Sequence, residues 1–208
     1  MSTKVKICGI TCENDIRILN KFLPDYAGFV FAESRRRITA ETAKSLVSEF
    51  DPKVKRVGVF VNMEIEQLAE LAEKVGLDTV QLHGDETQQY IDSLRMFLDG
   101  KAQVWKAIRM SGEKSLNEME MYKADILLTD TYVKDIQGGS GTRFDWKLLK
   151  GNGEGNKVIL AGGLTPDNVS EAISIVRPYG VDVSSGVEMD GKKDELLVGK
   201  FINKVRKP

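Results

Sequence analysis

An alternation that runs through the whole chain constrains its fold most. Short apolar runs rich in β-branched residues are separated by longer stretches with the spacing of amphipathic helices. This pattern is typical of βα units packed around a parallel sheet. The expected strands are residues 5–10, 27–32, 56–61, 79–83, 104–109, 126–130, 157–161 and 181–184. Helices are expected at residues 39–50, 65–75, 87–98, 114–122 and 166–176, with a last one near 194–205.

Eight strands with helices between them in 208 residues predict an α/β fold, a (β/α)8 or TIM barrel of eight parallel strands. An open doubly wound sheet normally has fewer strands, and no G-x-G-x-x-G motif follows the first strand here. No low-complexity segment or boundary divides the chain. We therefore expect residues 1–208 to form a single domain.

Charge and composition limit the kinds of partner. The 30 Lys and Arg residues nearly balance 31 Asp and Glu, for a formal net charge of -1, so no basic excess favours nucleic acid or an anionic membrane. The sequence has no apolar run long enough for a signal peptide or a membrane span. A soluble, cytoplasmic protein is expected, in which any anionic ligand must be held by a local site.

Side-chain alternation along the strands predicts that polar groups face the barrel interior, because neighbouring residues of a strand point to opposite faces. Lys6 and Cys8 share one face of the first strand, and Asp182 lies on the equivalent face of the last. Catalytic groups in such barrels lie at the C-terminal ends of the strands. The candidates at such ends are Cys8, His83, Asp130 and Ser184.

Three glycine-rich or serine-rich stretches follow late strands, at residues 138–141, 161–164 and 184–186. Any one of them alone is better explained by a turn that needs positive φ. Three together favour a phosphate site made of backbone N–H groups, since barrels often bind phosphate after strands seven and eight. The candidate residues are Gly139, Gly141, Gly162, Gly163, Ser184, Ser185 and Gly186. The loop at 135–142 either closes over a ligand as a lid or is static.

The two cysteines, Cys8 and Cys12, form a weak metal motif, because zinc needs three or four ligands and the chain has one histidine. No metal is expected. Cys12 is predicted to lie at the start of the first helix as a small apolar residue. For Cys8, a reactive thiol and an inert core cysteine remain equally consistent with the sequence.

Each of the other polar candidates for the site also has two possible interpretations. Asp130 either caps the loop after its strand or acts as a positioned acid or base. His83 is better explained as a hydrogen-bonded histidine at a strand end than as a proton-transfer group. The run Arg35, Arg36 and Arg37 is either a solvated patch or a clamp for a carboxylate, which guanidinium binds with two parallel hydrogen bonds.

Seven motifs, in their order and spacing, resemble the phosphoribosylanthranilate isomerases of tryptophan biosynthesis over nearly the whole chain. They are K-I-C-G-I at 6–10, F-V-F-A-E-S-R-R at 29–36, V-Q-L-H-G at 80–84, L-L-T-D-T at 127–131, G-G-S-G-T-R-F-D-W at 138–146, L-A-G-G-L at 160–164 and V-D-V-S-S-G-V-E at 181–188. The family commonly has Ser-Pro-Arg after strand two, where this chain has Ser34-Arg35-Arg36, so spacing selects Arg36 with a one-residue error still open.

The resemblance implies an aldose–ketose isomerase that needs no cofactor and carries out the Amadori rearrangement of N-(5-phosphoribosyl)anthranilate. It implies Asp130 as the general acid that protonates the ring oxygen and Cys8 as the general base that removes the C2 proton. Arg36 is implied as the clamp for the anthranilate carboxylate, with His83 and Asp182 as further substrate contacts.

The expected partner is thus a small phosphorylated molecule, and the chain is expected to be a monomer or a homodimer. Rival interpretations are another phosphate-binding barrel enzyme, such as indole-glycerol-phosphate synthase or a ribulose-phosphate epimerase, and a non-catalytic barrel that binds a phosphorylated ligand.

Overall fold

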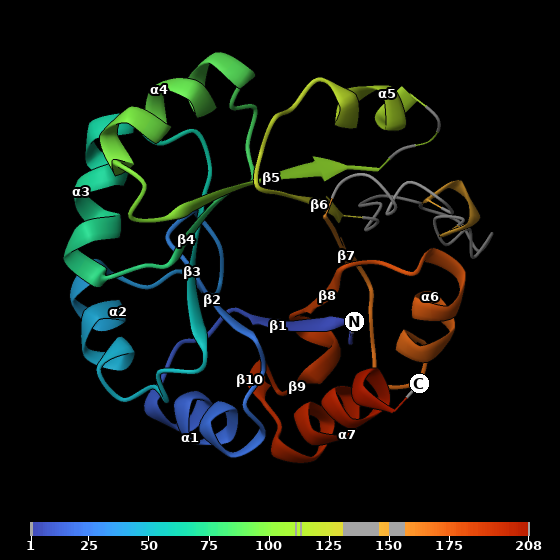
Figure 1. The fold of residues 1–208 in the computed structure, drawn as a ribbon. Helices are drawn as coiled ribbons and strands as arrows, with labels where there is room; N and C mark the ends of the chain where they lie inside the picture. Colours follow the sequence, from blue (N-terminus) through green and yellow to red (C-terminus); the bar gives the residue numbers. More distant parts are fainter. Residues whose placement is uncertain (1, 111, 113, 131–145, 150–156, 208) are drawn as a thin grey trace.

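The computed structural model describes residues 2–110, 112, 114–130, 146–149 and 157–207. Eight parallel strands close into a barrel in the order of the sequence, with helices around it (Figure 1). The predicted (β/α)8 barrel is therefore confirmed. Its strands are β1 (Lys4–Cys8), β2 (Tyr26–Val30), β3 (Lys55–Phe60), β4 (Thr79–Leu82), β5 (Gln103–Arg109), β6 (Ile126–Asp130), β7 (Val158–Ala161) and β8 (Gly180–Val183).

The surrounding helices agree with the predicted pattern, with end points that differ by a few residues. They are α1 (Glu13–Phe22), α2 (Ala40–Val47), α3 (Ile65–Val75), α4 (Gln88–Leu98), α5 (Lys114–Glu120), α6 (Val169–Val176) and α7 (Glu195–Arg206), with 3-10 turns η1 (Trp146–Leu149) and η2 (Ser185–Val187). In the part of the chain that the structure describes, no helix has the length and apolar character needed to cross a membrane.

Capping side chains explain where several helices begin and end. Thr39 and Thr87, predicted as helical, are instead N-caps whose hydroxyls accept backbone N–H bonds in the first turns of α2 and α4. Gly76 ends α3 in the left-handed conformation, as predicted. The prediction that a helix begins at Pro166 is wrong by three residues. The Asn168 side chain accepts from the Thr165 backbone N–H and donates to the Gly163 carbonyl, and residues 166–168 form a separate turn before α6.

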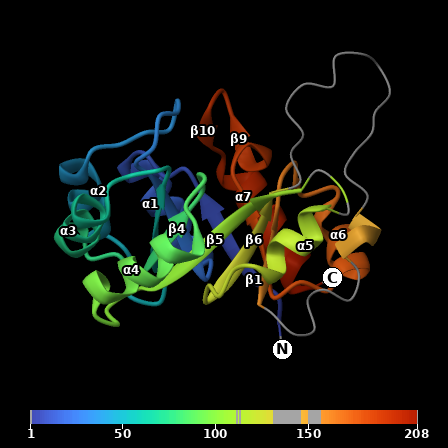
Figure 2. The same cartoon turned by 90° about the horizontal axis from the view of Figure 1, so that it is seen from above.

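A hairpin that the sequence analysis did not anticipate follows η2. Its strands are β9 (Glu188–Met189) and β10 (Lys192–Lys193), which pair antiparallel. The residues between them, Asp190 and Gly191, both have positive φ, as a tight hairpin turn requires. Seen from the side, the hairpin stands at the end of the barrel away from the N-terminus (Figure 2).

The core has two layers. The larger layer lies between the strands and the surrounding helices, and a smaller apolar cluster fills the barrel interior. Towards the N-terminal end of the barrel the interior holds Trp105, packed edge-on against Tyr26 with ring centroids 4.8 Å apart, while the Tyr26 and Tyr179 hydroxyls lie 3.3 Å from each other. Aromatic packing thus fills this end of the interior, and the polar inward residues gather towards the other.

Candidate active site

A cavity of about 720 Å³ opens at the C-terminal ends of the strands. The predicted site residues that line it are Cys8, Arg36, His83, Asp130, Gly162, Gly163, Asp182, Ser184, Ser185 and Gly186. They come from six separate segments of the chain, which the closed barrel brings to one rim. The remaining two predicted residues, Gly139 and Gly141, lie outside the described residues, as does the loop at 135–142.

Cys8 ends β1 with its side chain half-buried at the cavity wall. Burial raises the pKa of its thiol, and so does the charge of Asp182, while the ammonium groups of Lys6 and Lys193 lower it. The thiol is thus close to two cations that favour its ionised form. Cys12 occupies the N-cap position of α1, as predicted, and is also a free thiol. The two cysteines therefore have distinct structural positions.

Asp130, at the end of β6, lines the same cavity as Cys8 and lies beside His83. The His83 Nε2 atom is 3.4 Å from Asp130 Oδ2, and both side chains are about one-quarter exposed. On the other side of the ring, His83 Nδ1 lies 3.1 Å from the amide nitrogen of Gln81. A His83 ring that accepts from Gln81 at Nδ1 and directs an Nε2–H group at Asp130 fits both contacts. The contacts between Gln81 and His83 and between His83 and Asp130 therefore hold the Asp130 carboxyl group in place.

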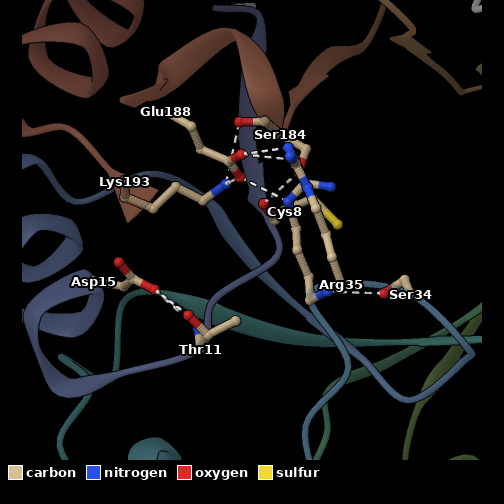
Figure 3. Close-up of polar contacts among 9 residues, drawn as sticks. Cys8, Thr11, Asp15, Ser34, Arg35, Ser184, Glu188 and Lys193 are labelled. Atoms are coloured by element: carbon tan, nitrogen blue, oxygen red, sulfur yellow. Dashed lines mark hydrogen bonds and ion pairs between the residues drawn. The ribbon is translucent and has the colours of Figure 1, made fainter. Parts of the chain in front are cut away.

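Arg36 is held by Glu188 of the hairpin. Its Nε and Nη2 atoms each donate at 2.7 Å, to the two different carboxylate oxygens. Glu188 also accepts from Lys193 at 2.7 Å and from Arg35 at 3.0 Å. Figure 3 shows the Glu188 carboxylate between Lys193 on one side and Arg35 on the other. These cations and hydrogen bonds outweigh burial and lower the pKa of Glu188 to about 2, so it is ionised at neutral pH.

The three arginines have different environments. The Arg36 side chain is 20% exposed, against 64% for Arg35, and both line the cavity. Arg37 pairs with Glu33, and its side chain is 54% exposed. Gly9 makes room for Arg36, since a Cβ at this glycine would overlap the Cδ atom of Arg36. The geometry therefore singles out Arg36 as the most enclosed cation of the run.

The loops after β7 and β8 approach each other closely. Gly162 and Gly163 both have positive φ, and a Cβ at Gly186 would overlap the carbonyl oxygen of Leu164. These glycines thus let two backbone segments meet without side chains between them, as a phosphate cradle requires. The Ser184 hydroxyl donates to the Cys8 carbonyl at 3.0 Å, which ties this loop to the end of β1.

The sequence analysis missed two charged residues near this site, Glu188 and Lys193. Both are enclosed, with side chains 4% and 1% exposed. The dipeptide Asp190-Gly191 between them is a hairpin signal that could have placed them face to face. Lys6 was expected inside the barrel, but no role was assigned to it. Among the described residues, no group of three or more His, Cys, Asp or Glu side chains is arranged to hold a metal ion.

Comparisons with known proteins agree with one another. The sequence model described as "N-(5'phosphoribosyl)anthranilate (PRA) isomerase" matches residues 5–204. The N-(5'-phosphoribosyl)anthranilate isomerase of Acetivibrio thermocellus is 47% identical over 98% of this chain and 96% of its own length. That of Thermoanaerobacter pseudethanolicus is 48% identical, over 98% of both chains.

Solved structures extend the likeness to three dimensions. The phosphoribosyl anthranilate isomerase of Thermotoga maritima is 39% identical with a TM-score of 0.85, covering 99% of this chain and 100% of its own. Another phosphoribosyl anthranilate isomerase, crystallised with reduced 1-(o-carboxyphenylamino)-1-deoxyribulose 5-phosphate, is 37% identical with a TM-score of 0.83, over 99% and 100%. A 3-hexulose-6-phosphate synthase at 16% identity and a TM-score of 0.71 shares the fold alone. The chain belongs to the N-(5'-phosphoribosyl)anthranilate isomerase family.

Proposed function

We propose that Asp130 and Cys8 are the general acid and the general base of the isomerisation that defines this family. The reaction converts N-(5'-phosphoribosyl)anthranilate into 1-(2-carboxyphenylamino)-1-deoxyribulose 5-phosphate. The observation that carries the proposal is the position of the two groups. They lie on β1 and β6 at the rim of one cavity, with a carboxylate-binding cation and two glycine-lined loops on the same rim.

The proton transfers assign one step to each group. Asp130 donates a proton to the furanose ring oxygen as the bond between this oxygen and C1 breaks, which leaves a protonated Schiff base at C1. The Cys8 thiolate then removes the proton from C2, and the electrons of that bond move to give an enolamine. The enolamine tautomerises to the amino ketone, so that the product is an isomer of the substrate. An acid and a base on different strands suit these two positions of the substrate.

Arg36 has the donors to hold the anthranilate carboxylate while it remains paired with Glu188. A guanidinium group has five N–H donors, and Glu188 uses those on one edge, between Nε and Nη2. The edge between Nη1 and Nη2 is a second fork that matches a carboxylate. We assign it to the substrate. In this arrangement Glu188 fixes the plane of the guanidinium.

The other substrate contacts follow from the same cavity. The 5-phosphate is assigned to the backbone of Gly162 and Gly163 and of Ser184 to Gly186, where the two glycine-lined loops meet. His83 orients Asp130, and Asp182 supports the reacting centre from the barrel floor. This places the phosphate and the carboxylate of the substrate on separate parts of the rim, with the acid and the base between them.

The coarser properties of the protein complete the proposal. We assign residues 1–208 to one catalytic domain, which acts on a small phosphorylated substrate in the cytoplasm. One solved relative is described as a monomeric form of the dimeric isomerase of Thermotoga maritima. We keep both a monomer and a homodimer as the assembly of this chain.

Fluorescence tests the proposal directly. Freshly generated phosphoribosylanthranilate is mixed with the protein, and the anthranilate fluorescence is followed with time. The wild-type chain should remove the signal, whereas Asp130→Asn should remove it at least about a hundredfold more slowly, as expected for loss of a general acid. Turnover by Asp130→Asn at the wild-type rate would exclude this residue as the acid.

A further inference from the structure

We propose that Lys6 is a positioning residue for this reaction: its buried ammonium group stabilises the thiolate of Cys8, and Asp182 holds that ammonium in place. The inference rests on the proposed base role of Cys8. It assigns to Lys6 no proton transfer, because the ammonium keeps its proton while the thiolate accepts the proton from C2.

The barrel register brings the three side chains together. Lys6 and Cys8 lie on the same face of β1, and Asp182 of β8 is the register partner of Lys6. The Lys6 Nζ atom donates to Asp182 Oδ2 at 2.8 Å. The Lys6 ammonium group is thus held by the Asp182 carboxylate on the neighbouring strand. Lys6 precedes Cys8 by two residues on the same face of β1.

Gly28 of β2 supplies the room for the approach of Lys6 to Cys8. It is the register partner of Cys8, and a Cβ at this position would stand 2.8 Å from the Cys8 sulfur and 3.1 Å from Lys6 Nζ. Both atoms therefore border the small space that the missing methyl group leaves free. Any larger residue at Gly28 would push the sulfur and the nitrogen out of their present positions.

Burial shows that the ion pair of Lys6 and Asp182 is not simply a stabilising device. The Lys6 side chain is fully buried, and that of Asp182 is 9% exposed. A buried pair stabilises a protein only when its remaining lone pairs are satisfied, because desolvation costs as much as the attraction provides. Here the second carboxylate oxygen, Asp182 Oδ1, is buried and has no hydrogen-bond partner among the residues that the structure describes. A function in the site explains why such a pair is kept.

The charges around Cys8 support the same inference. Burial alone would lower the pKa of Lys6, but Asp182 and Cys8 raise it above its ordinary value, so the ammonium stays charged. Burial raises the pKa of the Cys8 thiol, Lys6 lowers it, Asp182 raises it and Lys193 of β10 lowers it. Arg36, from the loop after β2, also interacts with Cys8. Lys6 is thus the cation with the largest opposing effect on a thiol whose pKa burial still holds above its ordinary value.

Alkylation of Cys8 by iodoacetamide, measured across pH without substrate, tests the inference, since only the thiolate reacts. All variants carry Cys12→Ala, which removes the second thiol. Lys6→Met should move the midpoint of the alkylation profile up by at least about one pH unit, which lowers the rate at pH 7 about tenfold. Asp182→Asn should move the midpoint down, because it removes a negative charge and leaves the ammonium to the thiolate.

The opposite signs of the two shifts separate this role from a structural one. If both variants move the midpoint in the same direction, or if neither moves it, the inference is wrong. The double variant Lys6→Met/Asp182→Asn leaves no unpaired buried charge and protects the test against misfolding. Its midpoint should lie between those of the single variants, and a midpoint equal to that of Asp182→Asn would overturn the proposal.

A failure of this inference is distinguishable from a failure of the proposed function. If Cys8 is not the base, Cys8→Ala will retain isomerase activity, whatever the alkylation profiles of the other variants show. If Cys8 is the base and Lys6 assists it, the acidic limb of the kcat/KM profile should move to higher pH in Lys6→Met by the same amount as the alkylation midpoint. An unmoved acidic limb in an otherwise active Lys6→Met would refute the role of Lys6.

Discussion

Glu188→Gln tests whether the hairpin positions Arg36. In the wild-type chain, the bidentate pair with Arg36 and the ammonium group of Lys193 outweigh burial and lower the pKa of Glu188 from 4.5 to about 2. A shift of this size corresponds to about 3 kcal/mol, at about 1.4 kcal/mol per pKa unit. Arg35 is largely exposed and Arg36 borders the cavity, so solvent screening reduces this value. We therefore expect Glu188→Gln to lower the free energy of unfolding by about 2 kcal/mol at pH 7.

The sign of the pH dependence follows from the lowered pKa. A carboxylate with a lower pKa in the folded state stabilises the protein above its unfolded pKa, here about 4.5, and this contribution is lost as the pH falls towards 2. Urea unfolding should therefore show the full difference between wild type and Glu188→Gln at pH 7 and a smaller difference at pH 3.5. The matched control is Glu73→Gln, which removes an exposed carboxylate paired with Lys101 and should leave stability unchanged at both pH values.

The kinetics of Glu188→Gln distinguish two roles for Glu188. It either positions the Arg36 guanidinium for the substrate carboxylate or competes with that carboxylate for it. If Glu188 fixes the plane of Arg36, its replacement should raise KM about three- to tenfold and leave kcat within about twofold, since the interaction is made equally before and during the reaction. If Glu188 only competes with the substrate carboxylate, KM should fall. A lower KM, or a stability equal to that of Glu73→Gln, would refute the reasoning.

Three further predictions concern the proposed roles. Asp130→Asn should lower kcat at least about a hundredfold while the Kd of a product analogue, measured by titration, stays within a few-fold; a matching loss of binding would contradict an acid role. Cys8→Ala should nearly abolish turnover whereas Cys12→Ala should not, and equal effects in the fluorescence assay would remove the distinction between the two thiols. Arg36→Ala should chiefly raise KM; a larger increase for Arg35→Ala would show that the neighbouring arginine is the clamp.

The barrel was predictable because its signals are local and repeated. Each strand reads as a short β-branched run, and an error of one or two residues at an end does not change the number or the order of the strands. One strand, β6, and one helix, α3, match their predicted bounds at both ends. β6 is a strongly apolar run, and α3 ends at a glycine. The start of α6 was misplaced because the side chain of Asn168 stabilises a turn that competes with the first helical turn.

The inward-facing site residues were predictable for a similar reason. Once the strands are assigned, their C-terminal ends must meet at one rim, so Cys8 and Asp130 come to one cavity although 122 positions of the sequence numbering separate them. Alternation along β1 also placed Lys6 on the face of Cys8. It did not show that Lys6 contacts Asp182, because that contact depends on the register between the first and the last strand, which only barrel closure sets.

Spacing after Ser34 selected Arg36 with a one-residue error still open, because the contacts that distinguish the three arginines are present in no local pattern. Arg36 is enclosed because Gly9, in the loop after β1, has no Cβ to block it, and because Glu188 reaches it from the far end of the chain. Glu188 in turn is enclosed by Arg36 and, because the Asp190-Gly191 turn folds β10 back, by Lys193. Each of these residues alone has the sequence character of a solvated loop. Their charges compensate one another only after three loops have met. We therefore expect the hairpin to be needed to hold Arg36 in the position proposed for binding the substrate carboxylate.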